Sequence, residues 1–238
     1  MSLIKVVCPN CGETINVMME NNNERTNNDF EIEGRILKKY HGNDDEVIIP
    51  DSVIEIATYS FANVYVKSVK IPNTVRRICT SAFANCKALE EIVLPEGLKK
   101  MEGNEFVECE KLEKIVFPCS LEEIGRESFE RCTSLKEVKI PSNVRIIGES
   151  AFRWCINLKE VELSEGLTEI NGYAFAGTAI EEIIIPESVE KIEYKHYDVF
   201  EGCKNLKRIS CNNPNSKALR EWVEHSSTAL AKSMKISS

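Results

Sequence analysis

Leu135 to Cys155 read LKEVKIPSNVRIIGESAFRWC, and this phrase, about 23 residues from one copy to the next, recurs seven times between Val47 and Cys211. Its fixed points are a proline after an alternating apolar stretch and a phenylalanine further on. Self-similarity at such a period is the signature of a solenoid, in which each repeat forms one coil. The prolines are Pro50, Pro72, Pro95, Pro118, Pro141 and Pro186, with Ser164 in the remaining place, and the phenylalanines are Phe61, Phe83, Phe106, Phe129, Phe152, Phe175 and Phe200.

Each repeat contains two short strand-like stretches, such as residues 137–140 and 144–147, followed by a turn that carries the phenylalanine. One repeat cannot fold alone, because ordering its residues costs more free energy than its few inward side chains return. Stacked coils share their apolar core and their backbone hydrogen bonds. The sequence therefore predicts a mainly β solenoid of about seven coils with short helical or 3-10 turns.

The two ends of such a stack need covers. Residues 30–46 alternate apolar and polar side chains around Gly34 and Gly42, which predicts a hairpin that caps the N-terminal end of a solenoid spanning residues 30–211. At the other end we expect a capping helix and a tail in residues 212–238. The apolar side chains there recur at helical spacing after an N-cap at Asn215 or Ser216, and they are Ala218, Leu219, Trp222 and Val223.

The repeat resembles that of the BspA-like, treponemal-type leucine-rich repeat family, whose pattern is Leu-x-x-Ile-x-Leu-Pro-x-x-Leu-x-x-Ile-Gly-x-x-Ala-Phe-x-x-Cys. The copy that begins at Leu135 follows this pattern through Pro141, Gly148, Phe152 and Cys155. The resemblance covers residues 30 to about 211. It implies a right-handed leucine-rich repeat solenoid with parallel strands on a concave face. It also implies adhesion or protein recognition, usually by secreted or surface-attached members.

The composition is that of an ordinary folded protein, with 42% hydrophobic and 29% charged residues among 238. Its apolar runs are far shorter than the roughly 18 residues that cross a bilayer. A formal net charge of −8 without a dense run of Lys or Arg disfavours nucleic acid and anionic membranes as partners. The first residues, up to Cys8, lack the apolar core of a signal peptide, so we expect a cytoplasmic protein whose ten cysteines are thiols or metal ligands.

Five of these cysteines form a column, each three residues after a repeat phenylalanine: Cys86, Cys109, Cys132, Cys155 and Cys203. In those repeats the phenylalanine lies nine residues before the next strand's first apolar residue, as from Phe83 to Ile92. In the two repeats without the cysteine the gap is eight, as from Phe61 to Val69. Thiol and turn length change together, which indicates that the cysteine fills a buried niche in the longer turn rather than binding a metal. Cys211 replaces an inward aliphatic residue, and Cys79 and Cys119 are expected near turns.

Cys8 and Cys11 lie outside the repeats, in Cys-Pro-Asn-Cys-Gly, and mark residues 1–20 as a zinc-knuckle-like segment that feeds a short strand. The motif resembles half of a zinc ribbon. Structural zinc takes four ligands, so the missing pair would come from a second copy of the protein or from a partner. A structural turn without metal and a redox dithiol are the alternatives, and the strand-like alternation after the motif disfavours the dithiol. Residues 21–29 carry no apolar side chain and predict a flexible, Asn-rich linker.

Side chains of a parallel strand alternate between core and surface, so the repeats predict two outward columns. The first is mostly acidic, as a solvated face would be, and consists of Ser68, Glu91, Lys114, Glu137, Glu160, Glu182 and Arg208. In the second, Val93 and Val116 stand side by side among charged residues, as in a modest protein-recognition site. Its members are Lys70, Val93, Val116, Lys139, Glu162, Ile184 and Ser210.

Two further surface features stand out. The seventh repeat carries three extra residues in a segment that contains Tyr194, His196 and Tyr197, and tyrosines in a protruding loop suit recognition. The alternative is sequence drift beside the capping helix. Trp154 occupies a place where other repeats have Asn, Glu, Arg or Gly, so we expect it to be exposed, either for recognition or against Lys or Arg stems of adjacent coils.

No catalytic constellation emerges, because His41, His196 and His225 lie in different segments without a paired nucleophile. The leading hypothesis is a non-enzymatic module that binds a protein partner through its concave face and the loop of the seventh repeat. In a structural alternative, zinc shared between two N-terminal knuckles makes a homodimer and the repeats act as a spacer. An adhesion-type surface protein, exported by an unrecognised route, and an enzyme of thiol chemistry are the remaining alternatives.

Overall fold

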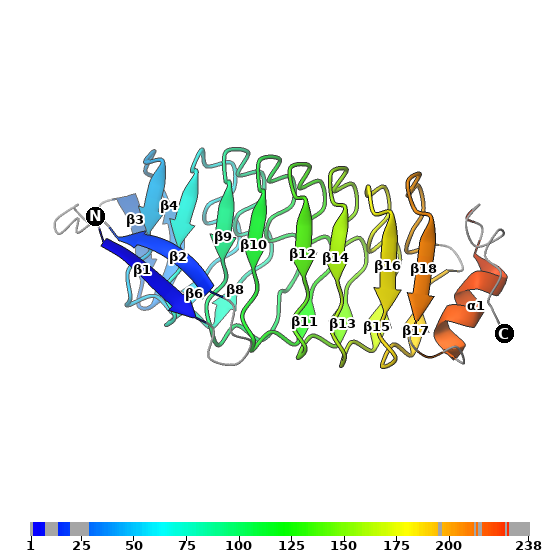
Figure 1. The fold of residues 1–238 in the computed structure, drawn as a ribbon. Helices are drawn as coiled ribbons and strands as arrows, with labels where there is room; N and C mark the ends of the chain where they lie inside the picture. Colours follow the sequence, from blue (N-terminus) through cyan, green and yellow to red (C-terminus); the bar gives the residue numbers. More distant parts are fainter. Residues whose placement is uncertain are drawn as a thin grey trace.

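The chain winds into a stack of parallel coils that runs from the hairpin at one end to a single helix at the other (Figure 1). The computed structural model describes residues 2–7, 14–19, 29–194, 197–211, 213, 216–226 and 228. Within these residues the fold is mainly β, as the periodicity predicts. The stack has about eight turns rather than seven, because the capping hairpin contributes a coil of its own.

Each coil contributes its first strand to one row, which we call the strand face. Neighbouring strands in this row pair in parallel with equivalent residues side by side, as Val69 with Ile92 and Val138 with Val161. Strand β10 lies beside β12, and β14 beside β16, so the row is continuous. The strands are β5 (Glu46–Ile48), β7 (Ser68–Lys70), β9 (Glu91–Val93), β10 (Lys114–Val116), β12 (Glu137–Lys139), β14 (Glu160–Glu162), β16 (Glu182–Ile185) and β18 (Arg208–Cys211).

The second strand of each coil joins a second parallel row. A turn connects the two rows, and in most coils it begins at the repeat proline, whose carbonyl accepts from the backbone three residues on, as in Val144 N to Pro141 O at 3.1 Å. An isolated bridge between Lys100 and Glu123 continues the row where one coil lacks a regular strand. The strands are β4 (Ile36–Tyr40), β6 (Glu55–Ile56), β8 (Arg77–Ile78), β11 (Glu123–Ile124), β13 (Ile146–Ile147), β15 (Glu169–Ile170) and β17 (Lys191–Ile192).

A third ladder runs through the phenylalanine turns. The rings are fully or almost fully buried and stack on one another along the axis, with centroids 4.9 to 6.0 Å apart. Tyr40 of the hairpin stacks on Phe61 at 5.1 Å and begins the column. Trp222 of the helix meets Phe200 edge-on at 5.5 Å and closes it. One continuous core therefore links both caps.

The turns on either side of the phenylalanines adopt the left-handed backbone conformation at two places in each coil from Phe61 to Phe175, and at Gly202 alone in the coil of Phe200. In the coil of Phe61 these are Tyr59 and Asn63, with φ of 58° and 64°, and in later coils the same places hold Ser, Asn, Glu, Arg, Trp, Tyr or Gly. A positive φ strains most side chains. The ladder of turn hydrogen bonds, such as Phe61 N to Ala82 O at 2.8 Å, holds the conformation in place.

Different elements cover the two ends. Strand β3 (Phe30–Glu33) pairs antiparallel with β4 and forms the N-terminal hairpin. Helix α1 (Lys217–His225) covers the C-terminal end, as the sequence predicts, with Ser216 as its N-cap and Ala218, Leu219 and Trp222 buried. Apart from these, β1 (Ser2–Val7) and β2 (Thr14–Met19) pair as an antiparallel hairpin.

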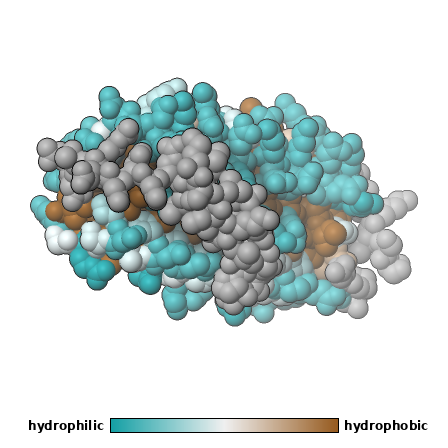
Figure 2. Space-filling model, turned by 60° about the vertical axis from the view of Figure 1, so that its left-hand side comes forward, coloured by the Kyte–Doolittle hydropathy of each residue, from teal (hydrophilic) through white to brown (hydrophobic). Residues whose placement is uncertain are grey.

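The outer surface is largely hydrophilic. On the face seen in Figure 2, hydrophobic residues gather in small areas among hydrophilic ones. Many Lys and Arg side chains of the described residues form ion pairs with carboxylates of an adjacent coil, as Lys136 does with Glu113 at 2.9 Å and Lys114 with Glu91 at 3.3 Å. In the described part of the chain, no helix has the length and apolar character needed to span a membrane.

Candidate binding surface on the strand face

The second outward column predicted from the sequence exists as one line of neighbouring side chains on the strand face. Strand register places Ile48 beside Lys70, Lys70 beside Val93, and Val93 beside Val116. The same register pairs Lys139 with Glu162 and Ile184 with Ser210. We call this line the mixed column, and its members are Ile48, Lys70, Val93, Val116, Lys139, Glu162, Ile184 and Ser210.

Aliphatic side chains in the mixed column reach solvent. Ile48 is 57% exposed and Ile184 is 59% exposed, while Val93 and Val116 are half-buried against each other's coils. Lys139 Nζ lies 3.3 Å from Glu162 Oε1, so the charges between the aliphatic groups partly compensate. Sequence reasoning missed Ile48, although its place one residue after the inward Val47 matches that of Lys70 after Val69. The column offers apolar contact framed by compensated charge.

The first outward column is acidic and ion-paired in part. Arg208 pairs with Glu182, and Lys114 with Glu91, while Glu137 and Glu160 are direct strand neighbours of the same charge. A half-open pocket lies beside these two carboxylates. The residues that line it are Glu113, Lys114, Lys136, Glu137, Asn157, Lys159 and Glu160. Its openness suits the docking of a surface better than the enclosure of a small molecule.

The loop of the seventh repeat divides into two parts. Tyr194 is half-buried and stacks on His225 of helix α1 with ring centroids 5.1 Å apart, so it belongs to the contact between loop and cap. Tyr197 is 50% exposed and touches Tyr173 edge-on at 5.2 Å. His196 lies outside the described residues. Of the two loop tyrosines, Tyr197 is thus exposed, whereas Tyr194 packs on the last turn of helix α1.

The thiol column is a structural ladder, as the coupled turn lengths predict. Cys86, Cys109, Cys132 and Cys155 are fully buried, and each Sγ lies 3.1 to 3.2 Å from a phenylalanine carbonyl in the preceding coil, as Cys132 Sγ from Phe106 O. The half-buried Cys203 makes the same contact with Phe175 O at 3.0 Å. A thiol that donates to a backbone carbonyl satisfies a buried acceptor. These cysteines hold adjacent coils together.

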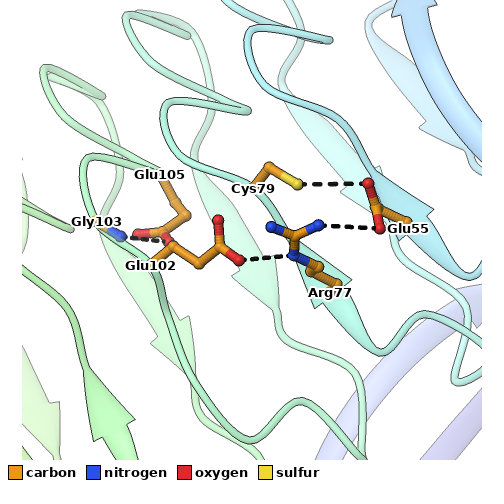
Figure 3. Close-up of polar contacts among 6 residues, drawn as sticks. All are labelled: Glu55, Arg77, Cys79, Glu102, Gly103 and Glu105. Carbon is orange, nitrogen blue, oxygen red and sulfur yellow. Dashed lines mark hydrogen bonds and ion pairs between the residues drawn. The ribbon is translucent and has the colours of Figure 1, made fainter.

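Cys79 follows β8, and its Sγ lies 3.7 Å from Glu55 Oε1 (Figure 3). Arg77 bridges Glu55 and Glu102 beside it, at 3.3 and 2.6 Å. Burial raises the pKa of the Cys79 thiol to about 11, so the thiol is protonated at neutral pH. Because the thiolate is the reactive form, this arrangement is not that of an activated nucleophile.

The predicted metal ligands Cys8 and Cys11 lie outside the described residues. The strands before and after them in the chain, β1 and β2, pair antiparallel with Val7 beside Thr14. Among the residues that the structure describes, no cluster of three or more His, Cys, Asp or Glu side chains could hold a metal ion.

Similarity to known proteins agrees with the leucine-rich repeat fold. Residues 39–145 and 122–228 match the model of a family described as BspA type Leucine rich repeat region. The chain belongs to this family. Its leucine-rich repeat coils are also similar to solved structures, while no curated protein matches the sequence.

Three of these structures are bacterial leucine-rich repeat proteins. A leucine-rich cell surface protein from Faecalibacterium prausnitzii is 32% identical, with a TM-score of 0.69 over 75% of this chain and 50% of that one. A leucine-rich repeat protein of T. pallidum is 31% identical, with a TM-score of 0.62 over 79% of this chain and 86% of that one. A third, from Eubacterium ventriosum, is 26% identical, with a TM-score of 0.65 over 71% and 46%. The chain thus spans half of the F. prausnitzii protein.

Proposed function

We propose that this leucine-rich repeat protein is a non-enzymatic binding module that recognises a protein partner through its strand face. The mixed column supports the proposal most directly. It places exposed aliphatic side chains at both ends of the row and a valine pair between them, on a rigid sheet with compensated charges. A small apolar centre with a charged rim is how a modest protein interface is built.

The thiols and the loop of the seventh repeat do not have the features of a catalytic site. The thiols are buried in a ladder, Cys79 has a raised pKa, and the loop tyrosine Tyr194 packs against the cap. Catalysis needs a nucleophile or an acid-base pair within reach of a substrate, usually in a concave site. Binding without catalysis is the function that this geometry favours.

Capture of the native partner tests the proposal. A variant that carries Lys70→Glu, Lys139→Glu and Val93→Asp changes the mixed column at three points. We expect it to lose the partner that the wild-type protein retains from the source cell, because a buried charge replaces apolar contact and two basic groups change sign.

A matched control changes charge on the other row. Lys100→Glu and Lys191→Glu alter two exposed lysines of the second row, each paired with a glutamate of an adjacent coil. This control should capture the partner as the wild type does. Undiminished capture by the strand-face variant would exclude the strand face as the binding surface.

We also propose a second role for the N-terminal hairpin. Cys8 and Cys11 in the connection between β1 and β2 supply two thiolates, half of a tetrahedral zinc site, and a second copy would complete it. His41 is the next His or Cys in the chain, and its Nε2 lies 3.2 Å from Glu31 Oε2. This proposal concerns assembly and is independent of the strand face.

Metal content and mass in solution test the zinc-linked dimer. The wild-type protein should carry one zinc per two chains and have the mass of a dimer. The Cys8→Ser, Cys11→Ser variant should be a zinc-free monomer with an unchanged far-ultraviolet circular dichroism spectrum. A wild-type monomer without zinc would refute the proposal.

A further inference from the structure

An aromatic cluster lies on the phenylalanine-turn side of the stack, apart from the strand face. Its members are Trp154, Tyr173 and Tyr197, which come from three consecutive coils. Trp154 is 44% exposed and Tyr197 is 50% exposed. Tyr173 is half-buried, and the centroid of its ring lies 5.2 Å from that of Tyr197. We call these three residues the aromatic ridge.

The ridge is held in place by its neighbours. The Trp154 ring lies against the backbone of Gly177, since a Cβ on that glycine would come within 2.7 Å of the indole Cε3. The guanidinium of Arg153 lies over both Tyr173 and Trp154, 4.8 and 5.8 Å from their centroids. Cation-π contact and the glycine beneath the indole fix the rings without burying them. Little side-chain entropy remains to be lost when a ligand binds.

Charges of both signs lie beside the ridge, and they include the Glu201 carboxylate next to Tyr173. Arg153 Nη1 lies 3.8 Å from Glu130 Oε1, and Arg131 Nη1 lies 3.7 Å from Glu108 Oε1 in the same turns. The ridge therefore presents flat rings together with hydrogen-bond donors and acceptors, without a strong excess of either sign. Such a surface favours an uncharged ligand over an acidic or basic one.

We propose that the aromatic ridge is a stacking platform for an uncharged carbohydrate chain. The negative face of an aromatic ring attracts the positive C–H edges of a sugar ring, and the neighbouring guanidinium and carboxylates can hydrogen-bond its hydroxyl groups. The three rings come from consecutive coils, so the ridge runs along the stack of coils. The ridge is open rather than enclosed, which suits a chain that lies along the stack.

Protein recognition is the competing explanation, because Trp, Tyr and Arg are also enriched in protein hot spots. The absence of a broader apolar surround favours carbohydrate. Close to Trp154 in the chain, Ile156 is another exposed apolar side chain among the described residues. The other exposed residues of these turns are mainly charged or polar. The two explanations differ in what the ridge captures, so one experiment separates them.

The intact protein is applied to an array of neutral oligosaccharides that includes glucan, mannan, xylan and galactan fragments, and the best glycan is titrated in solution. The chain has two tryptophans, of which Trp222 is fully buried, so a change in intrinsic fluorescence on titration reports on Trp154. We expect saturable capture and a saturable change in emission. Trp154→Asn and Tyr173→Ser should each weaken binding about tenfold or more.

These variants are matched to the fold. Asn63 and Asn85 occupy the place of Trp154 in other coils, and Ser81 and Ser150 that of Tyr173, all with φ between 56° and 64°. Unchanged thermal unfolding would confirm that both variants fold. A Val93→Asp, Val116→Asp variant of the strand face should bind the glycan normally, which separates this inference from the proposed function. Equal glycan capture by the wild type and Trp154→Asn would overturn the carbohydrate proposal, and so would the absence of capture by both proteins. If the variants lose a protein partner and the wild type binds no glycan, the ridge is a protein-recognition site.

Discussion

Glu105 shows how much a residue's effect depends on its place in a column. Its carboxyl is fully buried, with Oε1 accepting from Gly103 N at 2.7 Å (Figure 3). Oε2 has no hydrogen-bond partner among the described residues. Burial raises the pKa of this carboxyl above its usual value. The other coils have small or aliphatic residues at this place: Ser60, Ala82, Ser128, Ala151, Ala174 and Val199.

Replacing Glu105 by serine should therefore stabilise the protein at neutral pH. The Oγ of Ser128 donates to the Gly125 carbonyl at 2.9 Å, and a serine at 105 can make the equivalent bond. We expect the free energy of unfolding at pH 7 to rise by about 1 to 3 kcal/mol, because a poorly satisfied buried carboxylate is removed. Denaturant unfolding measures the difference.

The pH dependence follows from the direction of the pKa shift. A carboxyl with a raised folded-state pKa is stabilising in its protonated form, below the unfolded pKa near 4.5, and loses this contribution as pH rises through the folded pKa. The advantage of Glu105→Ser should thus shrink as pH falls toward 4. Ala151→Ser, in the same column, is the control and should show no such trend. An advantage that grows in acid would contradict this account.

The buried thiols should be inert in the folded protein. Burial raises the pKa of Cys109, Cys132 and Cys155, so these thiols stay protonated at pH 8, and iodoacetamide needs the thiolate. Mass spectrometry after brief treatment should find them unmodified in the native state and fully modified in denaturant. Rapid native alkylation of any of the three would show that the ladder opens or that a thiol is activated.

At the scale of the element, stacking of the buried phenylalanine rings is a main apolar contact between coils. The Phe129 ring lies 5.4 Å from both Phe106 and Phe152 and is fully buried. Phe129→Ala should lower the free energy of unfolding by about 3 to 5 kcal/mol, since it leaves a cavity between two rings. The exposed Ile156→Ala is the control, with an expected change below about 0.5 kcal/mol. Equal effects in denaturant unfolding would contradict a shared aromatic core.

Asp198 of the seventh repeat contacts the C-terminal cap. It is buried and accepts from Phe200 N at 2.9 Å, from Trp222 Nε1 at 3.2 Å and from Ser226 Oγ. Asp198→Ala should leave three buried donors unsatisfied and loosen helix α1. Hydrogen exchange should then rise in α1 and the last coil more than in the central coils. Unchanged protection of α1 would show that packing of Trp222 alone holds the cap.

The register of the elements could be predicted because the repeat fixes it. Val69, Ile92 and Val138 each occupy the inward place of their strand, and the outward columns follow from alternation. The backbone conformations of the turns could not be predicted from the sequence. The left-handed φ at Glu127, Arg131 and Trp154 is imposed by the ladder of hydrogen bonds between coils, since none of these residue types favours it.

At the scale of the whole molecule, the sequence indicated the outward columns of the strand face and singled out Trp154 and the loop tyrosines, but not the contacts that these residues make. The mixed column repeats with the period of the coil. The ridge depends on the cation-π contact of Arg153 with Tyr173 in the next coil. The loop contacts the cap through the hydrogen bond that Trp222 Nε1 donates to Asp198. Contacts of this kind depend on side-chain paths between coils, which the repeat pattern does not specify.

The same scale explains why binding is the expected function. Coils contact their neighbours through one core and through ion pairs on the surface, each pair worth about 0 to 1 kcal/mol. The pairs stabilise the stack only weakly, yet they neutralise some of the neighbouring charges on its surface. A rigid face of this kind is preorganised, so association costs little conformational entropy.

Photo-crosslinking of the partner tests the strand face most directly. A photoreactive phenylalanine analogue is placed at Val116 in the mixed column or, as a control, at the exposed Lys100 of the second row, and each protein is irradiated in extract of the source cell. We predict that the probe at position 116 forms one dominant adduct with a protein partner and that the probe at position 100 does not. A dominant adduct from position 100 alone would contradict it.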